Sequence, residues 1–179
     1  MGNFGKGAKF LSATALVIAP AASGVAQENQ DTRQALAQLM TDDGVPAGTV
    51  EVTAAPDGVL VEVLLSGLTP GEHALHLHEV GSCSPDFGAA GDHFAPDGNA
   101  HGFLNPDGPH GGDLPNVFVS VEGTATAHFY NNRVMLDEGD ASLMDEDGTA
   151  VIVHELPDLY GEEAGAGGRV ACGVLEHRL

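Results

Sequence analysis

The sequence has 179 residues, with 26 Asp and Glu against six Lys and Arg and a formal net charge of −20. This length supports one domain around one hydrophobic core. So acidic a chain argues against nucleic acid and an anionic membrane as partners, and it favours a soluble protein.

The first 26 residues differ from the rest of the chain. Lys6 and Lys9 precede an apolar run at residues 10–22, and small residues follow as far as Ala26. This layout is typical of a secretory signal peptide, and the run is too short for a transmembrane helix. We therefore expect a signal peptide at residues 1–26, one domain at 27–179, and export to the periplasm or the medium. A disordered soluble tail is the alternative.

Removal of this segment makes the chain still more acidic. Both lysines lie within it, so four arginines remain against 26 carboxylates, a formal charge of −22. Each arginine that lies near a functional site therefore stands out in the electrostatics of the mature chain.

Short segments of alternating or mainly apolar residues follow one another between turns rich in Gly and Pro. This spacing predicts hairpins in an antiparallel all-β domain. The expected strands are residues 49–53, 59–65, 74–78, 116–121, 124–130, 150–154 and 169–175. Residues 33–41 instead have the local propensity of a short helix, with Asp31 as a possible cap.

Two histidines lie two positions apart in the expected strand at 74–78. His76 and His78 would point to one face of the strand, with Leu75 and Leu77 on the other. Neighbouring imidazoles on a strand are the beginning of a copper or zinc site, although a polar strand face is an equal alternative. His154 ends the strand at 150–154 and could face both across a sheet.

Residues 80–115 contain eight Gly and five Pro and show no regular period. So long a connection is unusual in a compact domain unless something holds it in place. Side chains suited to that task are Cys83, His93, His101, His110 and Asp113. One ring nitrogen from each of the three histidines, together with the Asp113 carboxylate, would suit tetrahedral zinc. Spacing alone leaves open which histidines share an ion.

The chain has two cysteines, Cys83 and Cys172. In an exported protein such a pair indicates one disulfide, with two buried free thiols as the alternative. Other catalytic motifs are missing from the sequence: it has no HExxH, CxxC, GxSxG or phosphate-binding glycine loop.

Five ordered blocks, taken together, resemble one known family. They are GLTPGEHALHLHEVG (67–81), AGDHFAP (90–96), HGGDLPNV (110–117), VIVHELPD (151–158) and GGRVACGV (167–174). With these blocks, the chain resembles secreted copper/zinc superoxide dismutases from about residue 34 to residue 175.

The resemblance implies an eight-stranded antiparallel Greek-key β-barrel or sandwich of immunoglobulin-like type, with two long functional loops. In that fold residues 33–40 form the first strand, so tertiary context would override their helix propensity. The implied reaction is dismutation of superoxide to oxygen and hydrogen peroxide by one-electron cycling of copper. The alternative function is a non-catalytic periplasmic protein that binds or buffers copper on the same fold.

The family pattern also implies a role for each matching residue. The implied copper ligands are His76, His78, His93 and His154. The implied zinc ligands are His93, which bridges the two metals, with His101, His110 and Asp113. Asp158 would hydrogen-bond one histidine ligand of each metal, Arg169 would attract superoxide, and Cys83 would pair with Cys172.

One departure from the family concerns charge. Glu162 and Glu163 occupy the loop where many members carry lysines that steer the anion. Arg169 would then attract superoxide almost alone, aided by the metals. His73 is expected to have a structural role, His128 is expected to be an ordinary, partly buried histidine, and His177 is not expected to bind metal. The sequence is compatible with a monomer or a homodimer.

Overall fold

The computed structural model describes residues 1–2 and 33–178. The chain divides into two units, Met1–Gln30 and Asp31–Leu179, and the first lies almost entirely outside the described residues. The expected signal peptide at residues 1–26 therefore lies outside them as well, apart from its first two residues. Among the described residues, no helix is long and apolar enough to span a membrane.

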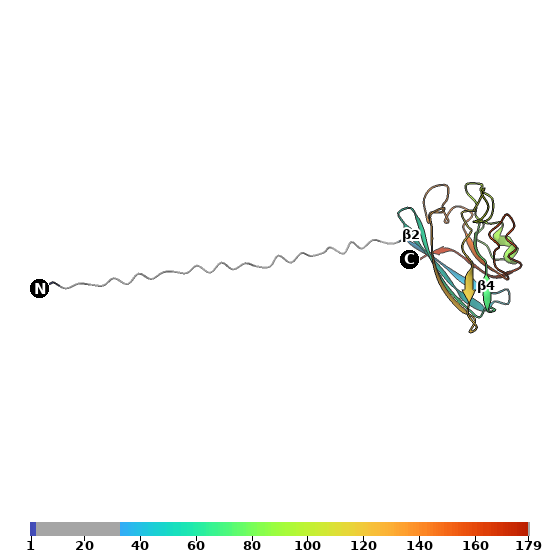
Figure 1. Cartoon of the computed structure of the whole chain (residues 1–179), viewed down its shortest axis with the longest axis horizontal. Coiled ribbons are helices and arrows are strands. Elements are labelled where there is room, and N and C mark those ends of the chain that lie inside the picture. Colours follow the sequence, from blue (N-terminus) through green and yellow to red (C-terminus); the bar gives the residue numbers. More distant parts are fainter. Residues whose placement is uncertain (3–32, 179) are drawn as a thin grey trace. The chain divides into compact units, whose positions relative to one another are not determined.

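The second unit consists of strands connected by turns and two long loops (Figure 1). The strands are β1 (Gln34–Met40), β2 (Pro46–Ala55), β3 (Gly58–Ser66), β4 (Gly71–His73), β5 (Leu75–His78), β6 (Val117–Val119), β7 (Thr124–Asn131), β8 (Ala150–His154), β9 (Arg169–Val174) and β10 (Glu176–His177). One 3-10 turn, η1 (Phe87–Ala90), lies in the first long loop. The described residues contain no α-helix, so the all-β prediction is confirmed.

Eight strands form one curled antiparallel sheet. Seven of them follow the order β5-β8-β9-β1-β2-β3-β7, and β10 pairs with β1. A second sheet pairs β4 with β6. Only Ala74 separates β4 from β5, and a tight turn joins β6 to β7, so the small sheet connects the two ends of the large one. This is the expected barrel-like antiparallel fold.

Strand β1 shows why helix propensity gave the wrong answer for residues 33–41. Ala35, Ala37 and Leu39 are completely buried, whereas the residues between them are partly or fully exposed. This period of two matches a strand with one face on a core. β1 also pairs with β2 along nearly all its length, and that pairing and burial outweigh the local preference for helix.

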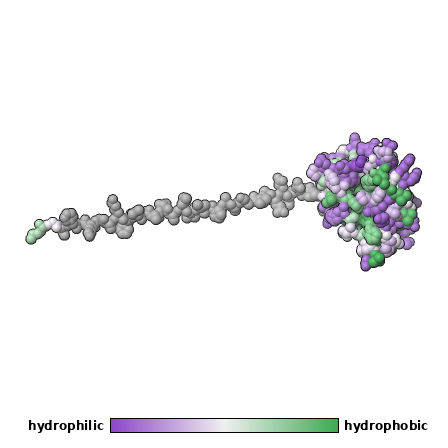
Figure 2. Space-filling view, in the orientation of Figure 1, coloured by the Kyte–Doolittle hydropathy of each residue, from purple (hydrophilic) through white to green (hydrophobic). Residues whose placement is uncertain are grey.

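The main core lies inside the curl of the sheet. Alternate residues of β2, β3 and β5 point into it, including Val50, Val61, Leu75 and Leu77. The other face of β8 is covered by a smaller apolar cluster around Ile152, packed beneath η1. Hydrophilic residues cover much of the visible surface of residues 33–178, with hydrophobic patches between them (Figure 2).

A disulfide joins Cys83 in the first long loop to Cys172 in β9, across 89 positions of sequence. The predicted disulfide is thus confirmed, and the described residues contain no free cysteine. The bond attaches the start of an irregular segment to a central strand of the sheet.

We predict that replacing Cys83 and Cys172 together by Ser lowers the free energy of unfolding by roughly 4 to 5 kcal/mol, because the unfolded chain loses an 89-residue loop constraint. Urea denaturation of the variant and of the reduced native chain should give matching values. A loss below about 1 kcal/mol would show that the crosslink adds little to stability.

Candidate metal centre

Two neighbouring strands place three histidines close together. His76 and His78 lie on the face of β5 opposite to Leu75 and Leu77, and both are completely buried. His154 is the last residue of β8, and its N–H donates to the carbonyl of Ala74 at 2.9 Å. The rings of His154 and His76 are 4.9 Å apart between centroids. The predicted approach of His154 to the β5 pair is confirmed.

The first long loop returns to run beside β5. Leu77 donates its N–H to the carbonyl of Gly112 at 2.9 Å and accepts the N–H of Phe94 at 2.9 Å, while Gly112 donates to Phe94 at 2.7 Å. A Cβ at residue 112 would lie 2.2 Å from the Leu77 oxygen, so this approach requires glycine. His93 and Asp113 each lie next to one of these residues.

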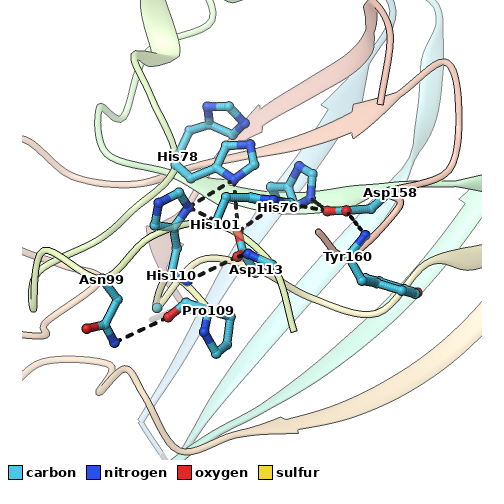
Figure 3. Close-up of polar contacts among 12 residues, drawn as sticks. His76, His78, Asn99, His101, Pro109, His110, Asp113, Asp158 and Tyr160 are labelled. Atoms are coloured by element: carbon cyan, nitrogen blue, oxygen red, sulfur yellow. Dashed lines mark hydrogen bonds and ion pairs between the residues drawn. The ribbon is translucent and has the colours of Figure 1, made fainter. Parts of the chain in front are cut away.

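The returning loop thus brings its ligand-bearing residues beside the strand histidines. His93 forms an isolated bridge with His78, and Asp113 forms one with His76. Residues far apart in sequence therefore meet at one edge of the sheet (Figure 3).

The side chains form two overlapping groups with donor atoms within 4.8 Å of one another. The first consists of His76, His78, His93 and His154. The second consists of His76, His93, His101 and Asp113. His76 and His93 belong to both groups, and His93 is the residue expected to bridge the two metals. The first group contains the four residues expected around copper.

The second group differs from the expected zinc set at one position, since it includes His76 and not His110. His110 nevertheless lies close by: its Nδ1 is 3.3 Å from Asp113 Oδ1 and 3.4 Å from His93 Nδ1. His101 Nε2 is 3.7 Å from the same Asp113 oxygen. Asp113 Oδ1 is therefore in reach of all three histidines of the expected set.

Ring nitrogens in the first group provide a test of whether the residues fit a metal. His76 Nδ1, His78 Nε2 and both nitrogens of His154 are buried and have no hydrogen-bond partner among the described residues. The other nitrogens of His76 and His78 contact Asp158 and the Gly91 carbonyl, respectively. Unpartnered buried polar atoms are costly, whereas neutral imidazole nitrogens bind copper and zinc well. The donors fit these metals.

Asp113 is held in its ionised form. Its Oδ2 accepts the backbone N–H groups of Gly102 and His110, each at 3.0 Å, and its Oδ1 lies 2.9 Å from His93 Nδ1. Burial acts to raise the pKa of Asp113, but these hydrogen bonds and the nearby histidines outweigh it and lower the pKa. A buried carboxylate is therefore available to a cation.

Asp158 lies between the two groups. Its Oδ2 is 2.7 Å from His76 Nε2 and 2.9 Å from His101 Nε2 (Figure 3). Burial acts to raise its pKa, but the contact with His76 and the N–H of Tyr160 lower it overall. One carboxylate oxygen thus touches a histidine of each expected metal site.

Arg169 begins β9 and is half-buried. Its guanidinium donates to the carbonyls of Phe87 at 2.5 Å and Gly91 at 2.7 Å. The Gly91 oxygen is also 3.0 Å from His78 Nδ1, so a single carbonyl separates the arginine from a histidine of the first group. A fixed positive charge therefore lies beside that group.

Besides His110, three histidines lie outside both groups. His73 is buried, with Nδ1 2.7 Å from the His154 carbonyl and Nε2 2.8 Å from that of Thr69. His128 is 3.2 Å from Glu62 with its side chain 56% exposed, so the expectation that it is partly buried is wrong. His177 Nε2 lies 3.3 Å from Asp137.

Sequence reasoning missed two residues at this centre, Asn116 and Tyr160. Asn116 contacts the backbone of Asp158, and Tyr160 contacts both Asp158 and Asn116. Asn116 is within the quoted block at 110–117, but nothing in its spacing points to a contact 42 positions away.

Burial favours the neutral form of His76, His78 and His154. It is the main cause that lowers the pKa of His78 to about 2 and that of His154 to about 3, and it lowers the pKa of His76 as well. Neighbouring positive charge, including Arg169 for the first two, acts in the same direction. Neutral imidazoles are the form that binds metal.

We predict that the metal-free protein loses stability as the pH falls from about 6.5 to about 3. The unfolded chain takes up protons on these histidines in that range and the folded chain does not, so the stability present above pH 6.5 is lost. In urea denaturation, His78→Gln should show a shallower pH dependence, and the exposed-residue control His128→Gln should match the native chain. Equal slopes in all three would refute this.

Comparison with known proteins agrees with the site. The family model described as copper/zinc superoxide dismutase (SODC) matches residues 46–175. The Cu-Zn superoxide dismutase of Caulobacter vibrioides is 47% identical over 148 residues, which cover 79% of this chain and 85% of the relative. Superoxide dismutase 2 (Cu-Zn) of Aquifex aeolicus is 42% identical, with 82% and 88% covered.

Solved structures show the same similarity. A SOD-like protein from Bacillus subtilis has a TM-score of 0.75 and 35% identity, covering 79% of this chain and 97% of that one. The Cu/Zn superoxide dismutase from Brucella abortus has a TM-score of 0.66 and 29% identity, with 80% and 99% covered. The chain belongs to the copper/zinc superoxide dismutase family, and its activity is the dismutation of superoxide with copper and zinc as cofactors.

Proposed function

We propose a division of this activity among the residues of the centre. Copper is bound by His76, His78, His93 and His154. Zinc is bound by His93, His101, His110 and Asp113. The observation that carries the copper set is the group of buried, unpartnered ring nitrogens on His76, His78 and His154. Asp113 Oδ1, within 3.7 Å of three histidine nitrogens, supports the zinc set.

The reaction converts two superoxide anions and two protons into oxygen and hydrogen peroxide. Copper, when bound, supplies the one-electron cycling that zinc cannot. His93 Nδ1 faces Asp113 at 2.9 Å, which leaves Nε2 toward the copper set. In our proposal His93 Nε2 would hold one proton in one half of the cycle and deliver it to the forming peroxide in the other, and the second proton would come from water.

Arg169 is the residue that attracts the substrate anion. A cavity of about 470 Å³ opens over His93, His101 and His110, but it is also lined by Glu79, Asp92 and Glu162. These acidic groups oppose entry of an anion from that side. Arg169 lies beside His78 and is not among the residues that line this cavity, so we place the substrate on the Arg169 side of the copper set.

We predict that Arg169→Ala lowers the second-order rate constant for superoxide by at least about tenfold and weakens its dependence on ionic strength, because the local positive charge that draws in the anion is removed. Pulse radiolysis at several salt concentrations measures both quantities. Arg133→Ala, which removes an exposed arginine, is the control and should leave the rate nearly unchanged. Native kinetics for Arg169→Ala would eliminate this role.

We also predict that His110→Ala and His78→Ala each reduce the content of one metal and spare the other. His110→Ala should reduce bound zinc while copper stays near its native level, since His110 contacts only the Asp113 side of the centre. His78→Ala should reduce copper and spare zinc. Elemental analysis after loading and dialysis gives both contents. Native zinc in His110→Ala would mean that His76 completes the second group instead.

The alternative of a non-catalytic copper buffer is less well supported. The residues that such a protein could dispense with, His93, His154 and Arg169, are all present, and the first two belong to the group that fits copper. The acidic composition supports the absence of nucleic acid and membrane partners.

We further propose that the protein is exported, with cleavage after Ala26, and that it acts as a monomer or a homodimer. The disulfide and the likeness to bacterial relatives support export. An amino terminus at Gln27 in the secreted or periplasmic fraction would support this, and intact protein retained in the cytoplasm would count against it.

A further inference from the structure

The two oxygens of the Asp158 carboxylate have different partners. Oδ2 faces the histidines, at 2.7 Å from His76 Nε2 and 2.9 Å from His101 Nε2. Oδ1 accepts the backbone N–H of Tyr160 at 2.6 Å. Figure 3 shows the contact between Tyr160 and Asp158, which is separate from the contacts of Asp158 with the histidines. The position of Oδ2 therefore depends on how the backbone at residues 158–160 is held.

One side chain holds both backbone polar groups of Asp158. The Asn116 side-chain oxygen accepts the N–H of Asp158 at 2.8 Å, and its Nδ2 donates to the Asp158 carbonyl at 3.0 Å. Asn116 is partly buried and lies just before β6, outside both donor groups. This pair of hydrogen bonds fixes the loop segment that carries Asp158.

Tyr160 holds the same segment from a second direction. It has a φ of 60°, and among the described residues it is the only non-glycine with a positive φ. Its phenolic oxygen accepts the N–H of Asn116 at 2.7 Å, and its carbonyl accepts the N–H of Leu104 at 2.7 Å. Its ring packs edge-on against Phe103 at 5.6 Å. An unusual backbone conformation is thus maintained by contacts to both neighbouring loop segments.

The zinc set depends on these contacts more than the copper set does. His76, His78 and His154 lie on strands β5 and β8, so the ladder fixes their backbone independently of Asp158, and only the His76 ring contacts that carboxylate. His101, in contrast, belongs to the irregular loop, and its two ring nitrogens hydrogen-bond Asp158 at 2.9 Å and the Gly161 carbonyl at 2.8 Å. Asp158 belongs to the segment that Asn116 and Tyr160 hold, and Gly161 directly follows it.

We propose that Asn116 and Tyr160 are positioning residues that act through Asp158 to set the affinity for zinc. This inference depends on the proposed zinc set. Groups that orient a metal ligand commonly alter metal affinity by about 10- to 100-fold when they are removed. Asn116 and Tyr160 contact Asp158 and not a metal ligand, so their effect on zinc passes through the Asp158 carboxylate.

The test measures the zinc dissociation constant by chelator competition in the copper-loaded protein. Asn116→Ala should weaken zinc binding by about tenfold or more, and Tyr160→Phe, which removes only the hydroxyl, by a smaller factor. Tyr130→Phe is the matched control, since it removes the hydroxyl of the other tyrosine, which donates to the Asp57 carbonyl in an exposed turn. It should bind zinc like the native chain.

Two further readouts distinguish positioning from general stability. The loss of zinc affinity should exceed what any fall in the Tm of the metal-free variants accounts for. Asn116→Ala should also weaken zinc binding little more when added to Asp158→Asn, because both changes act on one contact. Native zinc affinity in both variants, full additivity with Asp158→Asn, or affinity lost only in proportion to a lowered Tm would each overturn the proposal.

The same experiment separates this inference from the metal assignment. If Asp158→Asn itself leaves zinc affinity unchanged, the proposed role of Asp158 in the zinc site fails. If Asp158→Asn weakens zinc and Asn116→Ala does not, only the role of Asn116 and Tyr160 fails.

Discussion

The centre depends on one set of backbone hydrogen bonds, those that hold the returning loop against β5. Leu77 exchanges hydrogen bonds with Gly112 and Phe94, and the residues beside these partners are Asp113 and His93. Because the strand fixes Leu77, it also fixes the distance between His76 and His78 and the loop groups. An irregular segment thereby gains the precision of a sheet at the point where metals bind.

Several imidazoles are buried together at this centre, and they can be so because they are neutral. Desolvation disfavours their charged form, and the lowered pKa values of His76, His78 and His154 show that the fold keeps them neutral. Their unpartnered nitrogens are a local instability that a bound metal removes. Metal binding and folding should therefore be strongly coupled in this chain.

Much of the fold was accessible from the sequence because strand signals are local. Alternation and turn residues located β2, β3, β7, β8 and β9 to within a few residues, and the family resemblance corrected β1. The pairing of Cys83 with Cys172 followed from a count of two. By contrast, the separation of β4 from β5 at Ala74 and the extra pairing of β10 with β1 depend on tertiary contacts that have no local signal.

The site divides in a similar way. The geometry brings together His76, His78, His93 and His154. These residues could be found from the sequence because histidine is a common metal ligand. Asn116 and Tyr160 were missed because their importance comes from contacts with backbone groups, which no side-chain pattern records. Likewise, the close position of His76 to the Asp113 group arises from the bridge between β5 and the loop, and spacing could not reveal it.

The central claim is that the buried histidines and the returning loop form one redox centre with two metals. Its most direct test is to load the purified protein with copper and zinc, count both metals per chain, and follow superoxide decay in the same sample. We expect about one of each metal per chain together with fast decay. Stoichiometric copper without turnover would contradict this account.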